Sequence, residues 1–373
     1  MKLFRLAGID VYVHGSWFII FFLLVWSFSC GFFPLLYPGL APGVCLTLGI
    51  VTTLLFFGSV LIHELSHSVV AVADGMEVQG ITLFIFGGVS QMRGDSLSPR
   101  SELRIAAAGP LASFVLGILF AGASWLAGRP EVNPWNGMMV HLALMNISLG
   151  VFNLLPGFPL DGGRLVRALL WRRHGDRLRA TMTAAQLGRG MAWCLILLGL
   201  WLTARGYLIQ GVWIAFIGLY LDRAAASERR DAVISSRLAG FRVETVMTPG
   251  AVTMPAGVTA AEALMSFRRD GFSGYPVVQD DRVVGVISLD QIESCPTSRR
   301  GTTPVRDLMT PLTPDQMATP DESLLSAVGK MTMQGLSRLP VLGRAGGGLA
   351  GLLTRHAVAQ RLRLAGLASG QGT

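Results

Sequence analysis

Two histidines and a glutamate have the spacing of a metal site in the segment His63-Glu64-Leu65-Ser66-His67. Residues four apart lie on one face of a helix, so both imidazoles can reach a single metal ion. Glu64 follows the first histidine directly, where its carboxylate can accept a proton from a water molecule bound to that metal. This segment is therefore a candidate for metal-assisted hydrolysis.

A catalytic zinc site needs a third protein ligand and an open position for water. The best candidate is Asp161, which lies 94 residues beyond His67 in the segment Asn153-Leu-Leu-Pro-Gly-Phe-Pro-Leu-Asp161-Gly-Gly-Arg164. Its prolines break a helix, and its glycine pair allows two backbones to approach closely. An Asp at this position is also typical of a helix cap. Beside the two histidines, the ligand interpretation is favoured, and it predicts one zinc ion per chain.

The elements that position these residues are apolar. Of the 373 residues, 51% are hydrophobic and only 14% are charged, whereas about 25% are charged in an ordinary soluble domain. The composition therefore indicates a membrane protein. Apolar runs predict six spans, near residues 15–33, 44–73, 104–127, 136–156, 190–205 and 207–221. The two histidines and Glu64 fall inside the second span, where ionisable groups are costly and indicate function.

Arginine distribution predicts the orientation. Basic residues collect after the fourth and sixth spans, at Arg164, Arg167, Arg172, Arg173, Arg177, Arg179, Arg189, Arg223, Arg229 and Arg230. Positive residues concentrate on the cytoplasmic side. We therefore expect a multi-pass protein of an inner cell membrane, in contact with the lipid bilayer, with both termini cytoplasmic. These loops explain the net charge of +8. A nucleic-acid-binding protein would have a run of basic residues beside stacking aromatics, and this sequence has none, so nucleic acid is not expected as a partner.

The second half of the chain contains a repeat with a period of 62 residues. Three pairs of segments match: Val243-Glu-Thr-Val-Met-Thr-Pro249 with Val305-Arg-Asp-Leu-Met-Thr-Pro311, Tyr275-Pro-Val-Val278 with Leu339-Pro-Val-Leu342, and Gly285-Val-Ile-Ser288 with Gly351-Leu-Leu-Thr354. Such a period indicates duplicated units packed on each other, and the pattern resembles a tandem pair of CBS domains.

The predicted architecture is a polytopic α-helical membrane protein of six transmembrane helices with a C-terminal α/β tandem CBS domain. Its parts are a membrane domain over residues 1–222, a linker helix over 223–241, CBS repeats over 242–300 and 301–362, and a disordered tail over 363–373.

Together, His63-Glu-x-x-His67 and Asn153-x-x-Pro-x-x-Pro-Leu-Asp161-Gly-Gly resemble the site-2 proteases, which are intramembrane zinc metalloproteases. The resemblance extends over nearly the whole chain through Val13-His14-x-Ser-Trp17, Phe86-Gly-Gly-Val89 and Ala108-Gly-Pro-Leu-Ala-Ser113. In that family the last segment usually ends in Asn, whereas this chain has Ser113 there. No metal role is attached to this position. Six spans followed by CBS repeats look like the branch that contains the sporulation pro-sigma-factor protease and its archaeal relatives.

This resemblance implies that His63, His67 and Asp161 bind zinc, that Glu64 is the general base and that Asn153 donates to the developing oxyanion. It implies cleavage of peptide bonds in or near the transmembrane segments of membrane-tethered regulatory proteins, such as a transcription-factor precursor or an anti-sigma factor. The CBS pair would then be regulatory.

CBS pairs often bind adenine nucleotides through a Ser or Thr that is followed three residues later by Asp. Here Ser288 is followed at that offset by Gln291, and Thr354 by Ala357. Both hydroxyls are candidate nucleotide contacts, but nucleotide binding and a docking role, including a homodimer through the CBS pair, stay equally open.

An alternative from another class is a CBS-gated transporter or channel, which the repeats alone would favour. A transporter does not need ligands at zinc-protease spacing. A degenerate homologue that binds substrate without cutting it is a third interpretation, and the intact Glu64 argues against it.

Two expectations concern local structure. Residues 76–93 are predicted to form a hairpin whose edge pairs with an unwound substrate strand. Gly109-x-x-x-Ser113-x-x-x-Gly117 is predicted to be a small-residue face for helix packing in lipid.

Overall fold

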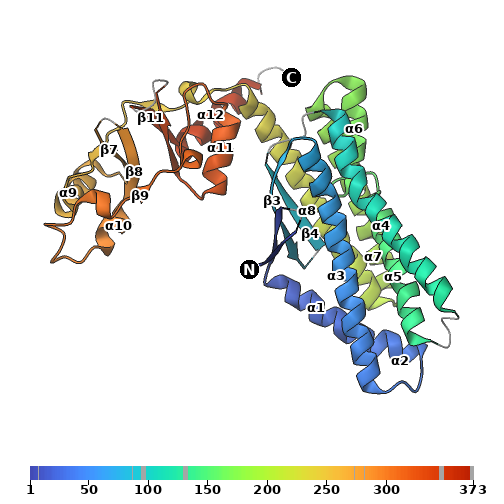
Figure 1. Ribbon diagram of the computed structural model, residues 1–373. Helices are drawn as coiled ribbons and strands as arrows, with labels where there is room; N and C mark the ends of the chain where they lie inside the picture. The colour runs from blue at the N-terminus through green and yellow to red at the C-terminus, as the bar shows by residue number, and fades with distance from the viewer. Residues whose placement is uncertain are drawn as a thin grey trace. The chain divides into compact units, whose positions relative to one another are not determined.

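The computed structural model describes residues 1–6, 8–85, 87–93, 98–128, 133–272, 274–280, 282–343 and 348–369. The chain divides into two compact units, Met1–Ala232 and Val233–Thr373, and Figure 1 labels most of their helices. The predictions for Phe86 and for the last four residues fall outside the described part.

In the described part of the chain, six helical segments are long and apolar enough to cross a membrane, as predicted. They are Ser16–Leu36 (formed by α1 Ser16–Trp26, a π-helical turn Ser27–Phe32 and α2 Phe33–Leu36), α3 Pro42–Ala73, α4 Pro99–Ala127, α5 Pro134–Asn153, α7 Arg177–Ala204 and α8 Leu208–Ala239. Helices α3, α4 and α5 each begin at a proline, whose fixed φ and missing N–H suit the first turn.

Two helices extend more than ten residues beyond the predicted spans. Helix α7 begins at Arg177 rather than near 190, and the Asp176 side chain caps it by accepting from the N–H of Arg179 at 3.0 Å. Helix α8 continues to Ala239 and absorbs most of the predicted linker helix. Hydropathy identifies only the apolar part of a helix, whereas the helical hydrogen bonds continue through the polar residues beyond it.

The hairpin predicted over 76–93 is present as β3 (Glu77–Phe84) and β4 (Gly87–Arg93). The structure adds two strands that the sequence analysis missed, β1 (Lys2–Leu6) and β2 (Ile9–Val13). The sheet order is β1-β2-β3-β4; β2 pairs with β3 in parallel, and the other pairs are antiparallel. Strand β4 is therefore an edge strand of this sheet.

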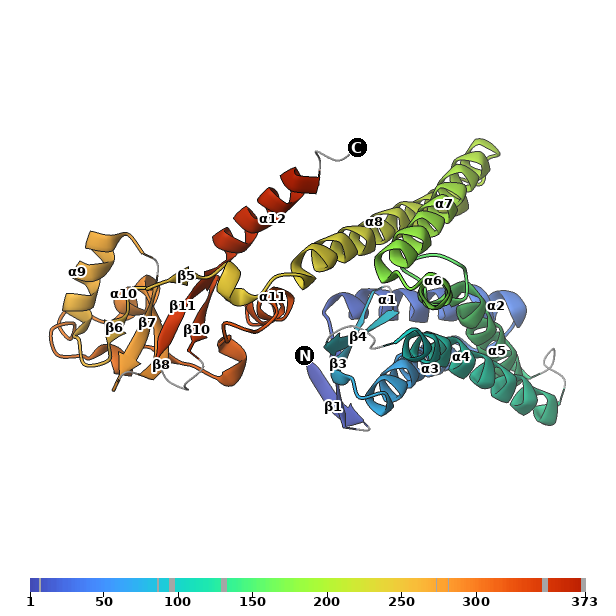
Figure 2. The same cartoon turned by 90° about the horizontal axis from the view of Figure 1, so that it is seen from above.

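A short helix between the fourth and fifth spans, α6 (Asp161–His174), carries the candidate aspartate at its first turn. Helix α4 packs against α3, α5 and α6, as the view from above shows in Figure 2. The predicted close approach of backbones at the glycine pair is confirmed, because a Cβ on Gly162 would overlap the carbonyl groups of Leu154 and Leu155. Gly157 lies equally close to the backbone of Gly188 in α7.

In the second unit, each repeat completes the sheet of the other. One sheet has the order β6-β7-β8-β9 (Met254–Pro255, Gly274–Gln279, Arg282–Ser288, Thr310–Pro311), and the other has the order β10-β11-β5 (Arg338–Leu342, Leu349–Thr354, Thr248–Pro249). The exchange is symmetric, since Gly285 pairs with Pro311 and Gly351 pairs with Pro249. Each Thr-Pro segment of the repeat thus crosses to its neighbour.

The helices of this unit are α9 (Ala260–Asp270), α10 (Leu289–Ser294), α11 (Leu324–Met333) and α12 (Arg355–Ser369). The tail predicted to be disordered from residue 363 is helical up to Ser369, so that part of the prediction is wrong. Leu and Ala dominate residues 364–368, and both are good helix formers.

Candidate metal centre

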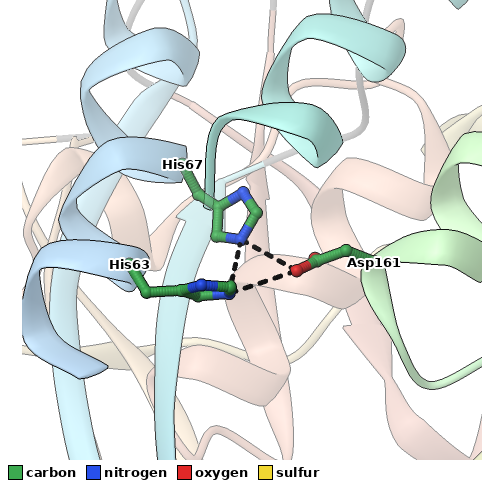
Figure 3. A group of neighbouring side chains, drawn as sticks. All are labelled: His63, His67 and Asp161. Atoms are coloured by element: carbon green, nitrogen blue, oxygen red, sulfur yellow. Dashed lines mark hydrogen bonds and ion pairs between the residues drawn. The ribbon is translucent and has the colours of Figure 1, made fainter. Parts of the chain in front are cut away.

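The two histidines of α3 and the aspartate of α6 converge on one point, as Figure 3 shows. The Nε2 atoms of His63 and His67 are 3.3 Å apart. The Asp161 Oδ2 atom lies 3.2 Å from the first and 3.1 Å from the second. Each histidine is only 3% exposed, and the Asp161 side chain is 12% exposed. Residues 94 and 98 positions apart in the sequence therefore form one buried cluster.

The three atoms have the separations that a zinc ion requires. Tetrahedral ligands at about 2.0–2.1 Å from zinc are about 3.3 Å from one another, and the observed separations are 3.1–3.3 Å. Two imidazole nitrogens and one carboxylate oxygen also form a known set of donors for catalytic zinc. The residues present thus fit the metal.

The far side of each imidazole is held by α4. The Nδ1 atom of His67 is 2.6 Å from the carbonyl oxygen of Ile105, which can only accept, so Nδ1 donates and leaves the Nε2 lone pair free. The Nδ1 atom of His63 is 2.9 Å from the hydroxyl of Ser113, which is fully buried. Ser113 is the position to which the sequence analysis gave no metal role. Ser113 is outside the candidate ligand set, but its hydroxyl contacts the ring of a candidate ligand.

The small-residue face of α4 also serves this site. A Cβ on Gly109 would overlap the Nε2 atoms of both histidines, so the absence of a side chain keeps the space beside them open. Gly117 packs against Ile147 of α5, as expected for helix packing in lipid. The face that was predicted to pack helices therefore does so at Gly117, whereas Gly109 and Ser113 contact the histidines.

Glu64 is held by the edge strand β4. The hydroxyl of Ser90 donates to Oε2 of Glu64 at 3.1 Å and is itself 3.0 Å from the hydroxyl of Ser68. A Cβ on Gly88 would overlap the Cγ atom of Glu64. Glu64 also interacts electrostatically with His63, His67 and Asp161. The carboxylate therefore lies between the candidate ligands and β4.

Asn153 is the last residue of α5, and its side-chain amide donates to the carbonyl of Leu149 at 3.0 Å within the same helix. Among the described residues, the structure gives no hydrogen bond between Asn153 and the three clustered side chains. The alternative interpretation of Asp161 as a helix cap is wrong, because Leu160 occupies the N-cap position of α6 and Asp161 is the first residue of the helix.

The two hydroxyls proposed for nucleotide contact are N-caps of short or terminal helices. Ser288 forms a capping box with Gln291 at the start of α10. The Thr354 hydroxyl accepts from the backbone N–H of Ala357 at 3.1 Å. Ser288 also lines a cavity of about 390 Å³ between the repeats, together with Gln291, Thr310, Ser337 and Arg338, among others. Thr354 does not line this cavity in the described part of the chain.

Comparisons with known proteins agree with this site. The profile of peptidase family M50 matches residues 51–134 and 129–197, and that of the CBS domain matches residues 243–294 and 305–364. The chain is 38% identical over 376 aligned residues to Rip3 of Mycobacterium tuberculosis, a protein provisionally named as a zinc metalloprotease; the match covers 99% of this chain and 94% of that protein.

Among solved structures, the chain is similar to the site-2 protease from Methanocaldococcus jannaschii, with 32% identity, a TM-score of 0.42, and coverage of 62% of this chain and 95% of that chain. The stage IV sporulation protein FB of Bacillus subtilis matches over only 161 residues at 29% identity, which covers 43% of this chain and 53% of that protein. The likeness to the sporulation protein is thus partial.

The family excludes the CBS-gated transporter that the repeats alone had favoured. Together with the buried cluster of two histidines and an aspartate, these matches show that the chain belongs to peptidase family M50, as a zinc metalloprotease of the site-2 protease type with six candidate membrane spans and a C-terminal pair of CBS domains.

Proposed function

We propose that this protein binds one zinc ion through His63, His67 and Asp161 and hydrolyses peptide bonds in or near the transmembrane segments of membrane-tethered regulatory proteins. The observation that carries the proposal is the convergence of these three side chains at zinc-ligand separations. The substrate class is that of a transcription-factor precursor or an anti-sigma factor. Both termini are cytoplasmic, and the CBS pair regulates cleavage.

The roles of the surrounding residues follow from their chemistry. Zinc supplies a Lewis acid that polarises the scissile carbonyl and makes water more acidic. Glu64 accepts the proton of the attacking water and then delivers it to the leaving amine. Ser90 holds the Glu64 carboxylate while it does so. Asn153 donates to the developing oxyanion once its amide is released from the carbonyl of Leu149.

The direct test is Glu64→Gln in the full-length protein, incubated in detergent with a panel of single-span membrane proteins. Cleavage should fall by about 10²–10⁴-fold, the usual contribution of a general base, while the zinc content is retained. Glu77→Gln in β3 is the matched control and should cleave normally. Cleavage by Glu64→Gln at the wild-type rate would contradict the proposal.

The edge strand β4 is proposed to bind the substrate in extended form. It ends the sheet on the side opposite β1, and it holds Glu64 through Ser90. An unwound substrate strand that pairs with this edge gains backbone hydrogen bonds beside the general base.

A proline at Val89 would test this role, because proline has no N–H and disrupts strand pairing. Each lost hydrogen bond costs about 1 kcal/mol, so KM should rise about fivefold or more, with zinc retained. Val89→Ala and Phe4→Pro, which is in the opposite edge strand β1, are the controls. Unchanged KM for Val89→Pro would remove β4 from the substrate site.

A further inference from the structure

A buried carboxylate outside the metal cluster faces two arginines. Glu102 lies in the first turn of α4 and is 0% exposed. Its Oε1 atom accepts from Nε of Arg164 at 3.1 Å and from Nη2 of Arg167, both on α6. The two guanidinium groups are themselves mostly shielded from solvent. The interpretation of these two arginines as inner-surface residues is therefore incomplete, because they neutralise a buried charge.

These ion pairs join the two helical turns that carry the metal cluster. Glu102 is three residues before Ile105, whose carbonyl accepts from Nδ1 of His67. Arg164 is three residues after Asp161, so it lies about one helical turn away along α6. Fixing Arg164 against α4 thus fixes the distance between the Asp161 carboxylate and the histidine rings.

The same end of α4 is also tied to α3, which carries both histidines. Asp74, just after α3, accepts from the Ser101 hydroxyl and from Nη2 of Arg104, each at 2.5 Å. Polar contacts therefore run from α3 through the first turn of α4 to α6. Glu228 of α8 adds a second carboxylate that interacts electrostatically with Arg164 and Arg167.

Helix α6 needs such an attachment because it has only 14 residues. Isolated helices of this length are marginal, and their placement depends on tertiary contacts. The glycine pair holds the backbone of its first turn, and the guanidinium of Arg167 lies 5.0 Å above the ring of Phe158. Of these contacts, the ion pair with Glu102 is the one made with α4, and α4 is the helix that contacts both imidazoles.

We propose that Glu102 is a positioning residue that sets Asp161 for metal binding through its ion pairs with Arg164 and Arg167. This inference rests on the proposed function, in which Asp161 is a ligand. Removing the carboxylate leaves two shielded guanidinium groups without a charge partner on α4, and the start of α6 then moves. Loss of a group bonded directly to a ligand weakens metal binding by about 10–100-fold, and Glu102 acts one residue further away, so the lower end of this range is expected.

The test is a double-mutant cycle on zinc affinity, measured by competition with a chromophoric chelator on the full-length protein in detergent. The four proteins are the wild type, Glu102→Gln, Asp161→Ala and the double variant. If Glu102 acts through Asp161, Glu102→Gln weakens zinc binding about 10-fold in the wild type, the lower end of the range for groups bonded directly to a ligand. In the Asp161→Ala background, the same substitution changes the affinity of the two remaining imidazoles very little.

Asp222→Asn is the matched control, because it removes another interhelical ion pair, 2.8 Å from Nε of Arg189, without touching α6. It should leave zinc affinity unchanged in both backgrounds. If Glu102→Gln does not fold, Arg164→Met removes one pair from the α6 side and is run through the same cycle, with a smaller effect in the same direction.

The outcomes separate the two proposals. Equal weakening by Glu102→Gln in both backgrounds would overturn the positioning role, because Glu102 would then act on the fold in general. Wild-type zinc affinity in Glu102→Gln would overturn it as well. If Asp161→Ala alone left zinc affinity unchanged, the ligand assignment in the proposed function would fail, and the positioning inference with it.

Discussion

The metal cluster and the CBS cavity make an instructive comparison, because a short motif pointed to each. In the metal cluster, side chains from α3 and α6 converge. Helix α4 contacts the Nδ1 atoms of both histidines, and Ser90 of β4 contacts the neighbouring Glu64. In the CBS unit, the hydroxyls of Ser288 and Thr354 cap their own helices. The metal motif thus keeps its ligand atoms pointed at one another, whereas the two CBS hydroxyls already accept from the backbone of their own helices.

The largest predicted effect tests the space in the metal cluster. Gly109→Ala places a methyl group against both Nε2 atoms. Zinc affinity should fall by at least about 100-fold, the upper range for outer-shell changes. Gly122→Ala in the same helix, where nothing lies within 4 Å of an added Cβ, is the control. Chelator competition measures both, and normal zinc binding by Gly109→Ala would contradict the described geometry.

The next effect tests the partners behind the ligands. Ser113→Ala removes the hydroxyl that contacts Nδ1 of His63, and we expect about 10-fold weaker zinc binding. Ser113→Asn introduces the residue that is usual at this position in the site-2 proteases. This variant should keep much of the zinc affinity, because the amide can also form a hydrogen bond with the His63 ring. Ser124→Ala, at a buried serine elsewhere in α4, is the comparison. Equal affinities for Ser113→Ala and Ser124→Ala would show that the hydroxyl contributes nothing.

A smaller effect is expected in the CBS unit. If Ser288 acts only as a cap, Ser288→Ala lowers the free energy of unfolding of this unit by about 1 kcal/mol. Calorimetry with ATP and AMP on the full-length protein should then give the same heat for wild type and variant. A nucleotide heat that appears in the wild type and disappears in Ser288→Ala, with Thr354→Ala run in parallel, would instead make this cavity a nucleotide site.

The smallest effect concerns pH. A hydrogen bond from Arg269, and a second from the Tyr275 hydroxyl, lower the pKa of Asp270. A lowered folded-state pKa means that this contribution to stability is present above about pH 3.9 and is lost as the pH falls through the lower folded-state value. Thermal unfolding of the CBS unit between pH 5 and pH 3 should therefore depend less on pH in Asp270→Asn. Parallel slopes for the two proteins would contradict this assignment.

The same comparison explains what the sequence could predict. The cluster of His63, His67 and Asp161 was predictable because helical spacing places two imidazoles on one face and a Pro-Gly-rich break precedes the aspartate. The six spans were predictable from long apolar runs. The resemblance to a known family supplied the remaining roles, including that of Asn153.

The supporting residues were not predictable in the same way. Ser113 and Ser90 lie 50 and 26 residues from the side chains that they contact, and a single serine carries no spacing signal. Strands β1 and β2 have five residues each; β1 is exposed throughout and carries no alternation, whereas β2 does alternate at Ile9, Val11 and Val13 and was a signal within reach. Glu102 did leave a signal, since an acidic residue lies at the edge of an apolar run while arginines cluster beyond Asp161, but only the packing of α4 on α6 connects them.

The most direct test of the central claim is the zinc content of the purified full-length protein, compared for wild type, His63→Ala and Asp161→Ala. The account predicts about one zinc ion per wild-type chain, as one three-ligand site requires, and its loss in both variants. That result would tie two distant segments to a single site. Folded wild type without zinc, or zinc retained in full by Asp161→Ala, would contradict it.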